Sequence, residues 1–435
     1  MIARLTFLLA AILAASAYGG GLDIRPGTEQ DVLVRQWARN IIVKLRPVSG
    51  STVPAAMSEV AARNLSHHAG FPLGRIRPMS GGAHVMSLPE NMPLAKAQSL
   101  AKKLMADPSV EYAEPDLILW PMLEPNDPYY TTYQWHYQAA ADEPGGANLP
   151  GAWQATTGSA AIVVAVIDTG LRPHADIDSN ILDSNGKVVP GYDFVSDPDV
   201  ANDGNARDED PSDPGDWITS TESATAGGIF EGCEVSDSSW HGTHVAGTIG
   251  ALSNNNMGVA GVDWNAKILP VRVLGKCGGY TSDFADAILW SAGFSISGIP
   301  DNPNPAKVIN LSLGGNAGDP PSCGITMQNA IDAVVAAGTV VVVSAGNSNM
   351  DAAYHTPANC NNVITVAATG REGQRANYSN YGTAIEIAAP GGDMSLATRD
   401  GILSTLNDGK TIPGADKFAF YQGTSMAAPH VSGIA

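Results

Sequence analysis

Basic residues are scarce in this sequence: 24 Lys and Arg stand against 43 Asp and Glu among 435 residues, for a net charge of −19. The imbalance is concentrated from residue 123 onward, where 12 basic and 34 acidic residues occur. A surface of this charge repels a phosphate backbone, which argues against nucleic-acid binding. It suits a secreted protein that holds cations.

Aromatic residues are also few, at 6%, whereas 47 Gly and 29 Pro indicate many loops and tight turns. Internal repeats, coiled-coil heptads and low-complexity tracts are absent from the sequence. The length exceeds that of one ordinary domain, and an apolar fraction of 44% is enough for a large core.

Long apolar runs are missing after the first residues of the chain. Residues 1–17 have the pattern of a secretory signal peptide, with Arg4 before the apolar run 5–14 and small residues at 15–17. The alternative is a membrane anchor, but the run is short for a bilayer span. We therefore expect export, through the periplasm in a Gram-negative source, and no membrane association once the signal is removed.

Residues 18–122 are predicted to form a separate small α+β domain. Asn40–Leu45 and Ser109–Tyr112 have the pattern of strands, and Ala95–Met105 has that of a helix with Lys102 and Lys103 near its end.

From residue 123 onward the pattern changes to buried strands alternating with helices, which predicts an α/β fold with a mainly parallel sheet covered on both faces. The expected strands are Ile162–Ile167, Lys267–Leu274, Val308–Leu313 and Thr339–Val343. The expected helices are His241–Leu252, Ser282–Ala292 and Met327–Ala337. Asp168 and Asn347 each follow a strand directly, where a shared site is expected in such folds.

Three short motifs carry the chemistry. GTSMAAPH at 423–430 places Ser425 between small residues at the start of an expected helix, with Pro429 expected in its first turn. Gly-Thr-Ser alone is more typical of a turn or a helix cap. The motifs VIDTG and HGTHVAG add Asp168 and His241, the acid and the base that a serine nucleophile requires.

The blocks VIDTG, HGTHVAGTI, SLGG, SAGN, AAPG and GTSMAAPHV together resemble the signature of the subtilisin-like serine proteases. They occur in that family's Asp, His, Ser order, which is not the order of an α/β-hydrolase. The segment NDPYY resembles the thermitase branch, and the long acidic insert resembles secreted proteases of Gram-negative bacteria. VEYAEPD in the small domain resembles the family's inhibitory propeptide; an independent binding module is the alternative.

The resemblance implies a serine endopeptidase that acts on proteins and peptides, and a monomer is expected. Ser425 is expected to attack the carbonyl, His241 to act as base and then acid, and Asp168 to orient the imidazole. Asn347 is expected to donate to the oxyanion together with the Ser425 backbone N–H. His244 and His430 are expected to be structural. The alternative function is a catalytically silent binding protein with the same fold.

Substrate contacts follow from the same resemblance. They are expected from two walls of the pocket for the residue before the scissile bond and from a glycine-rich edge that pairs with extended substrate. These residues are Ser312, Leu313, Gly314, Ala345, Gly346, Gly275 and Gly278. Tyr354 or His355 is expected near the pocket floor.

Four cysteines in an exported chain indicate two disulfides, and three pairings are possible. Cys233–Cys277 is favoured because it ties the loop before His241 to the substrate edge. Cys323–Cys360 is favoured because it braces loops near the pocket. A cysteine nucleophile is not expected, since none adjoins the histidine motif.

Carboxylates are dense over residues 193–216, and a solvated acidic loop is the simplest interpretation. Asp203, Asp208 and Asp210 resemble in spacing a calcium loop of the kexin branch, and calcium favours such oxygen ligands. The family predicts a second calcium site, with the asparagine ligand open between Asn254 and Asn255. Its residues are Asp127, Asp176, Leu252, Asn255, Met257 and Val259.

The expected organisation is therefore a signal peptide at 1–17, an inhibitory propeptide at 18–122 and a catalytic domain at 123–435. The propeptide is expected to remain bound as an inhibitor after the protease cuts itself near Met122; a cut after Leu123 or Glu124, or by another protease, is the alternative. Family members continue past the helix that carries the serine, so the catalytic domain is expected to be a C-terminally truncated fragment.

Overall fold

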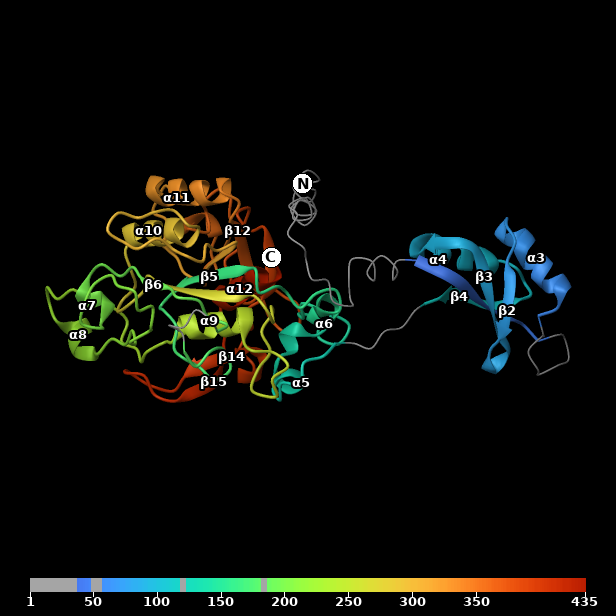
Figure 1. Ribbon diagram of the computed structural model, residues 1–435, viewed down its shortest axis with the longest axis horizontal. Helices are drawn as coiled ribbons and strands as arrows, with labels where there is room; N and C mark the ends of the chain where they lie inside the picture. The colour runs from blue at the N-terminus through green and yellow to red at the C-terminus, as the bar shows by residue number, and fades with distance from the viewer. Residues whose placement is uncertain (1–36, 48–56, 118–122, 181–185) are drawn as a thin grey trace. The chain divides into compact units, whose positions relative to one another are not determined.

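The computed structural model describes residues 37–47, 57–117, 123–180 and 186–435. The expected signal peptide and Met122 lie outside these residues. The chain divides into two compact units, Met1–Pro121 and Met122–Ala435, which are coloured blue and green to red in Figure 1.

The first unit is a four-stranded antiparallel sheet packed against two helices. The strand order is β2-β3-β1-β4, with β1 at Trp37–Leu45, β2 at Gly74–Pro78, β3 at Ala83–Pro93 and β4 at Val110–Asp116. The helices are α3 (Glu59–Ala69) and α4 (Leu94–Leu104), with a 3-10 turn at Ser80–Gly82. One apolar core joins them, so the α+β architecture expected here is observed.

The second unit is built on a seven-stranded parallel sheet of order β13-β12-β10-β8-β5-β7-β6. The strands are β5 (Val163–Asp168), β6 (Tyr192–Asp193), β7 (Lys267–Arg272), β8 (Val308–Leu311), β10 (Val340–Ser344), β12 (Ile364–Thr369) and β13 (Ile387–Pro390). The expected α/β fold is confirmed.

Helices cover both faces of this sheet. On one face lie α10 (Thr281–Ser291) and α11 (Ile325–Ala336), and on the other lie α9 (His241–Gly250) and α12 (Thr424–Ile434), as Figure 1 shows. Successive residues of a strand point to opposite faces. Accordingly, Ala165 and Ile167 of β5 enter one core, and Val164 and Val166 enter the other.

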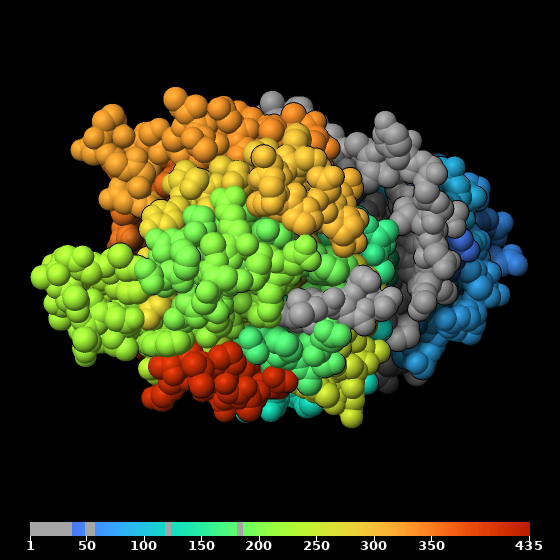
Figure 2. Space-filling view, turned by 60° about the vertical axis from the view of Figure 1, so that its left-hand side comes forward, coloured from blue at the N-terminus to red at the C-terminus, as the bar shows by residue number. Residues whose placement is uncertain are grey.

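Smaller elements complete the second unit. Two antiparallel pairs join β9 (Gly315–Asn316) to β11 (His355–Thr356) and β14 (Ile402–Asn407) to β15 (Asp416–Tyr421). The short helices are α5 (Tyr130–Tyr133), α6 (Leu149–Trp153), α7 (Pro198–Ala201) and α8 (Ser220–Ala224), with 3-10 turns at Trp135–Tyr137, Ala352–Tyr354 and Thr398–Asp400. In Figure 2 the β14–β15 hairpin, in red, lies beside green segments at the surface, where Ala175 N donates to Asp416 Oδ2 at 2.8 Å.

The expected position of Pro429 is wrong. Helix α12 begins at Thr424, so Pro429 lies inside the helix and not in its first turn. Proline there leaves the carbonyl of Ser425 without its intrahelical donor. The hydroxyl of Ser312 donates to that carbonyl at 2.8 Å, and this contact makes the proline tolerable.

No helix in the described part of the chain is long and apolar enough to cross a bilayer.

Candidate active site

Asp168 and His241 form a hydrogen-bonded pair at the carboxyl end of the sheet. Asp168 is the last residue of β5 and is fully buried, and His241 is the first residue of α9. Asp168 Oδ1 lies 2.7 Å from His241 Nδ1 and also accepts from Thr169 N at 2.8 Å. The pair therefore fixes the orientation of the imidazole and leaves Nε2 for proton transfer.

The charge state of His241 reflects two opposing effects. Burial disfavours the imidazolium, but the negative charges of Asp168, Asp216 and Asp213 outweigh burial and raise the pKa of His241 above its ordinary value. Asp216 also acts through hydrogen bonds: its two oxygens accept from the backbone N–H and the hydroxyl of Ser239, at 2.6 and 2.7 Å.

Ser425 lies at the second position of α12. Its hydroxyl donates to the backbone carbonyl of Ser312 at 3.2 Å. To pass its proton to His241, the hydroxyl has to turn away from that carbonyl. The Ser425 backbone N–H lies in the first turn of the helix, where amide groups lack intrahelical partners and are free to face an anion.

Asn347 follows β10 and borders the same space as the Ser425 amide. Its side-chain oxygen accepts from the backbone N–H and the hydroxyl of Thr424, both at 2.9 Å, which leaves the amide nitrogen to face outward. A Cβ placed on Gly423 would lie 3.5 Å from both Asn347 Nδ2 and Ser425 N. The glycine therefore keeps open a space that two N–H donors share.

A cleft of about 590 Å³ runs beside His241. Of the residues expected to contact substrate, Ser312, Leu313, Gly314 and Gly278 line it. Sequence reasoning missed the apolar side chains Leu274, Phe284 and Met327 on its walls, and Thr356 and Pro357 beyond them. The cleft offers an extended segment both backbone and apolar contacts.

The other expected substrate residues lie outside the lining of this cleft. Gly275 closes a tight turn with Gly278, and a Cβ on it would meet Val200 O at 2.0 Å. Ala345 N donates to Val366 O, and Gly346 N donates to Thr424 Oγ1. The ring of His355 lies close to Gly314 and Gly346. Substrate contact by Ala345 and Gly346 remains a prediction.

Both expected disulfides are present. Cys233 pairs with Cys277 and Cys323 with Cys360. Cys277 and Cys323 line the cleft, so each bridge anchors one of its walls.

His244 and His430 have structural environments. His244 is buried, its Nε2 donates to the carbonyls of Ile402 and Ala419, and burial lowers its pKa to about 3. Burial lowers the pKa of His430 to about 4, and this ring contacts Met426 O and His136. Both rings are therefore neutral supports at neutral pH.

Residues of the second expected calcium site, at Asp127 and Asp176, lie together. Asp127 and Asp176 are buried, and Asp127 Oδ1 has no hydrogen-bond partner. Asp176 accepts from Asn255 Nδ2 at 2.8 Å and from Val259 N at 2.9 Å, and burial raises its pKa to about 7. Asn254 N donates to Asp127 Oδ2 at 2.7 Å, and Asn255 Oδ1 accepts from Met257 N at 2.8 Å, so Asn255 as the ligand remains a prediction. Buried, incompletely bonded carboxylates fit a hard cation.

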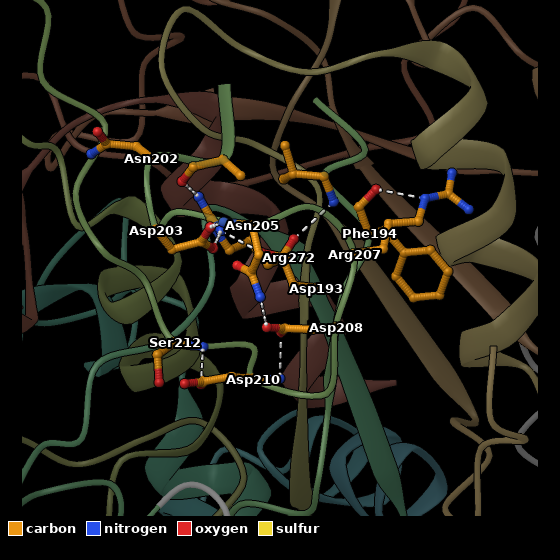
Figure 3. Close-up of polar contacts among 12 residues, drawn as sticks. Asp193, Phe194, Asn202, Asp203, Asn205, Arg207, Asp208, Asp210, Ser212 and Arg272 are labelled. Carbon is orange, nitrogen blue, oxygen red and sulfur yellow. Dashed lines mark hydrogen bonds and ion pairs between the residues drawn. The ribbon is translucent and has the colours of Figure 1, made fainter. Parts of the chain in front are cut away.

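In the acidic segment, residues 193–216, carboxylates are bonded to groups of the protein itself (Figure 3). Asp203 pairs with Arg272 at 2.7 Å, and Arg272 also pairs with buried Asp193. Asp208 accepts from Asn205 Nδ2 and from the backbone of Asp210. Within the described ranges, no cluster of three or more His, Cys, Asp or Glu side chains has the geometry of a metal site. An internal guanidinium thus neutralises part of the charge, and calcium at Asp203, Asp208 and Asp210 remains a prediction.

Comparison with known proteins shows the family of the chain. The profile of the Subtilase family matches residues 159–435. An extracellular protease of Xanthomonas campestris is 44% identical over 98% of the chain, and an extracellular basic protease of Dichelobacter nodosus is 43% identical over 84%. The chain spans 69% of the first relative and 57% of the second. A solved protease structure from Pseudoalteromonas arctica is 55% identical, with a TM-score of 0.64 over 71% of this chain and 85% of that one.

Proposed function

Because this chain belongs to the subtilase family of serine endopeptidases, we propose that it is a secreted endopeptidase that hydrolyses peptide bonds through Ser425, His241 and Asp168. The relatives named extracellular proteases support secretion. The observation that carries the proposal is the 2.7 Å contact between Asp168 and His241 at a cleft that Ser312 also lines, since the carbonyl of Ser312 accepts from the hydroxyl of Ser425.

In this mechanism the substrate lies extended in the cleft with its scissile carbonyl beside Gly423. Ser425 Oγ leaves the Ser312 carbonyl, passes its proton to His241 Nε2 and attacks the carbonyl carbon. Asn347 Nδ2 and Ser425 N stabilise the oxyanion. His241 then protonates the leaving amine, and water hydrolyses the acyl-enzyme by the same steps in reverse order. Asp168 stabilises the imidazolium throughout.

Two further parts of the proposal concern regulation and stability. Residues 18–122 act as an inhibitory propeptide, so the protein is made as a zymogen. Calcium stabilises the loop at Asp127 and Asp176, where the unpartnered oxygen of Asp127 supports a cation. When bound, calcium would neutralise the two carboxylates and hold loop 252–259; it takes no part in peptide hydrolysis.

The test is labelling of the mature protein with a fluorophosphonate, which reacts only with an activated serine. The native protein is expected to be labelled and to cleave casein, and Ser425→Ala is expected to lose both while still binding a non-covalent peptide substrate with similar affinity. A folded native protein that is never labelled would favour the silent binding protein.

A further inference from the structure

Thr169 joins Asp168 to Gly242, the residue that follows His241 in α9. Its backbone N–H donates to Asp168 Oδ1 at 2.8 Å. Its hydroxyl oxygen accepts from Gly242 N at 3.0 Å, the amide directly after His241. That amide is in the first turn of α9 and has no intrahelical acceptor. One residue therefore joins the end of β5 to the start of α9 at the point where the pair forms.

The direction of the Thr169 hydroxyl is set by Asp213. A hydroxyl has one proton to donate, and this one is donated to Asp213 Oδ2 at 2.7 Å. The other oxygen of Asp213 accepts from Gly215 N at 2.8 Å. Both carboxyl oxygens are therefore used, and the side chain has a single orientation.

Asp213 is itself held firmly against the strand that carries Asp168. It is 1% exposed. Its backbone N–H donates to Leu171 O, and Leu171 N donates to Pro211 O, so the end of the acidic segment pairs with the residues after Asp168. A Cβ on Gly170, which has a φ of +100°, would lie 2.6 Å from Pro211 O. The glycine is required for this close approach.

Burying a carboxyl group costs free energy that an apolar side chain of similar size would avoid. Here the group is placed where its hydrogen bond fixes Thr169, which joins the Asp168 carboxylate to the first turn of α9. We propose that Asp213 is a positioning residue: through Thr169, it holds Asp168 and the start of α9 in register for proton transfer. This inference rests on the proposed peptidase function.

The experiment is a double-mutant cycle on the mature enzyme with a chromogenic peptide. Asp213→Ala and Thr169→Val are each expected to lower kcat by about 100-fold with little change in KM, because loss of alignment acts on the chemical step. The double variant is expected to lose no more than either single variant, since both changes break one connection. Asp213→Asn, which keeps an acceptor for Thr169, is expected to recover part of kcat.

The controls separate this connection from a general change of net charge and from misfolding; Asp213→Asn separates it from the charge of Asp213, which raises the pKa of His241. Asp199→Asn removes an exposed carboxylate of the same segment and is expected to leave kcat unchanged. Thr169→Ser keeps the hydroxyl and is expected to stay close to the native rate. Thermal melting of each variant reports whether the fold is intact.

Each result has a defined meaning. A native enzyme without fluorophosphonate labelling contradicts the proposed function, not this inference. With an active native enzyme, a folded Asp213→Ala variant of native kcat, or additive losses in the double variant, would overturn the positioning role. If Asp213→Ala does not fold, equal kcat for Thr169→Val and Thr169→Ser overturns it, and a loss confined to Thr169→Val supports it.

Discussion

The hydroxyl of Ser312 donates to the backbone carbonyl of Ser425, while the hydroxyl of Ser425 donates to the carbonyl of Ser312. The first bond replaces the donor that Pro429 removes from α12. The second holds the nucleophile in a resting orientation. Residues of the SLGG and GTSMAAPH motifs thus fix each other, so the cleft wall and the nucleophile form one unit.

Asn347→Asp is expected to lower kcat by about 100- to 1000-fold, the usual cost of removing one oxyanion donor. Aspartate keeps an oxygen for Thr424 but places a second oxygen where Nδ2 was, so the geometry remains and the donor is lost. Single-turnover and steady-state kinetics would measure the effect. A drop in substrate affinity with unchanged kcat would assign Asn347 to ground-state binding and contradict this role.

The acidic limb of kcat/KM is expected to lie above pH 6.5. His241 must be neutral to act as base, and the carboxylates around it raise its pKa, so activity rises with pH through that raised value. Asp216→Asn removes one of these charges and is expected to move the limb to lower pH. Rates at constant ionic strength test this, with Asp199→Asn as the matched control. If the acidic limb of kcat/KM lies at the same pH in Asp216→Asn as in the native protein, the charge of Asp216 does not affect the pKa of His241.

Chelation of calcium is expected to lower the melting temperature of the mature protein. Saturation at a hundredfold excess over Kd stabilises a protein by about 2.7 kcal/mol. In Asp176→Asn the charge that would bind calcium is absent, so this variant is expected to melt at the same temperature with and without chelator. A chelator shift of equal size in both proteins would contradict the site at Asp127 and Asp176.

A separate variant tests the acidic segment. Asp208→Asn combined with Asp210→Asn is expected to remove part of the chelator shift if these residues bind calcium. Asp203 is left intact because its pairing with Arg272 has its own effect on stability. If chelator lowers the melting temperature of this variant as much as that of the native protein, the segment does not bind calcium. Arg272 and the segment's own backbone amides then neutralise its carboxylates.

Much of the fold and of the site could be predicted from the sequence because short local patterns encode them. Buried strands predicted the sheet, and the position of Asp168 directly after β5 placed it at the site edge. The role of Asp213 could not be predicted in this way. Its partner Thr169 is 44 residues away, and nothing in a run of aspartates distinguishes the one that turns inward. The β14–β15 hairpin was missed as well; Ser238 and Trp240 bond the loop that joins its strands, and such distant contacts leave no local pattern in the sequence.

The protease is expected to cut itself after Met122, which lies outside the described residues. The preceding residues Leu119, Trp120 and Pro121 are apolar, and the cleft is lined by the apolar side chains Leu274, Phe284 and Met327. Met122→Asp should slow processing in the purified precursor, because a charge would have to be desolvated, whereas Met122→Leu should process at the native rate. N-terminal sequencing of the product over time measures both. Cleavage also has to disappear in Ser425→Ala. If Ser425→Ala is still trimmed normally near Met122, another protease makes the cut. The residue at the cut then gives no information about the specificity of this protease.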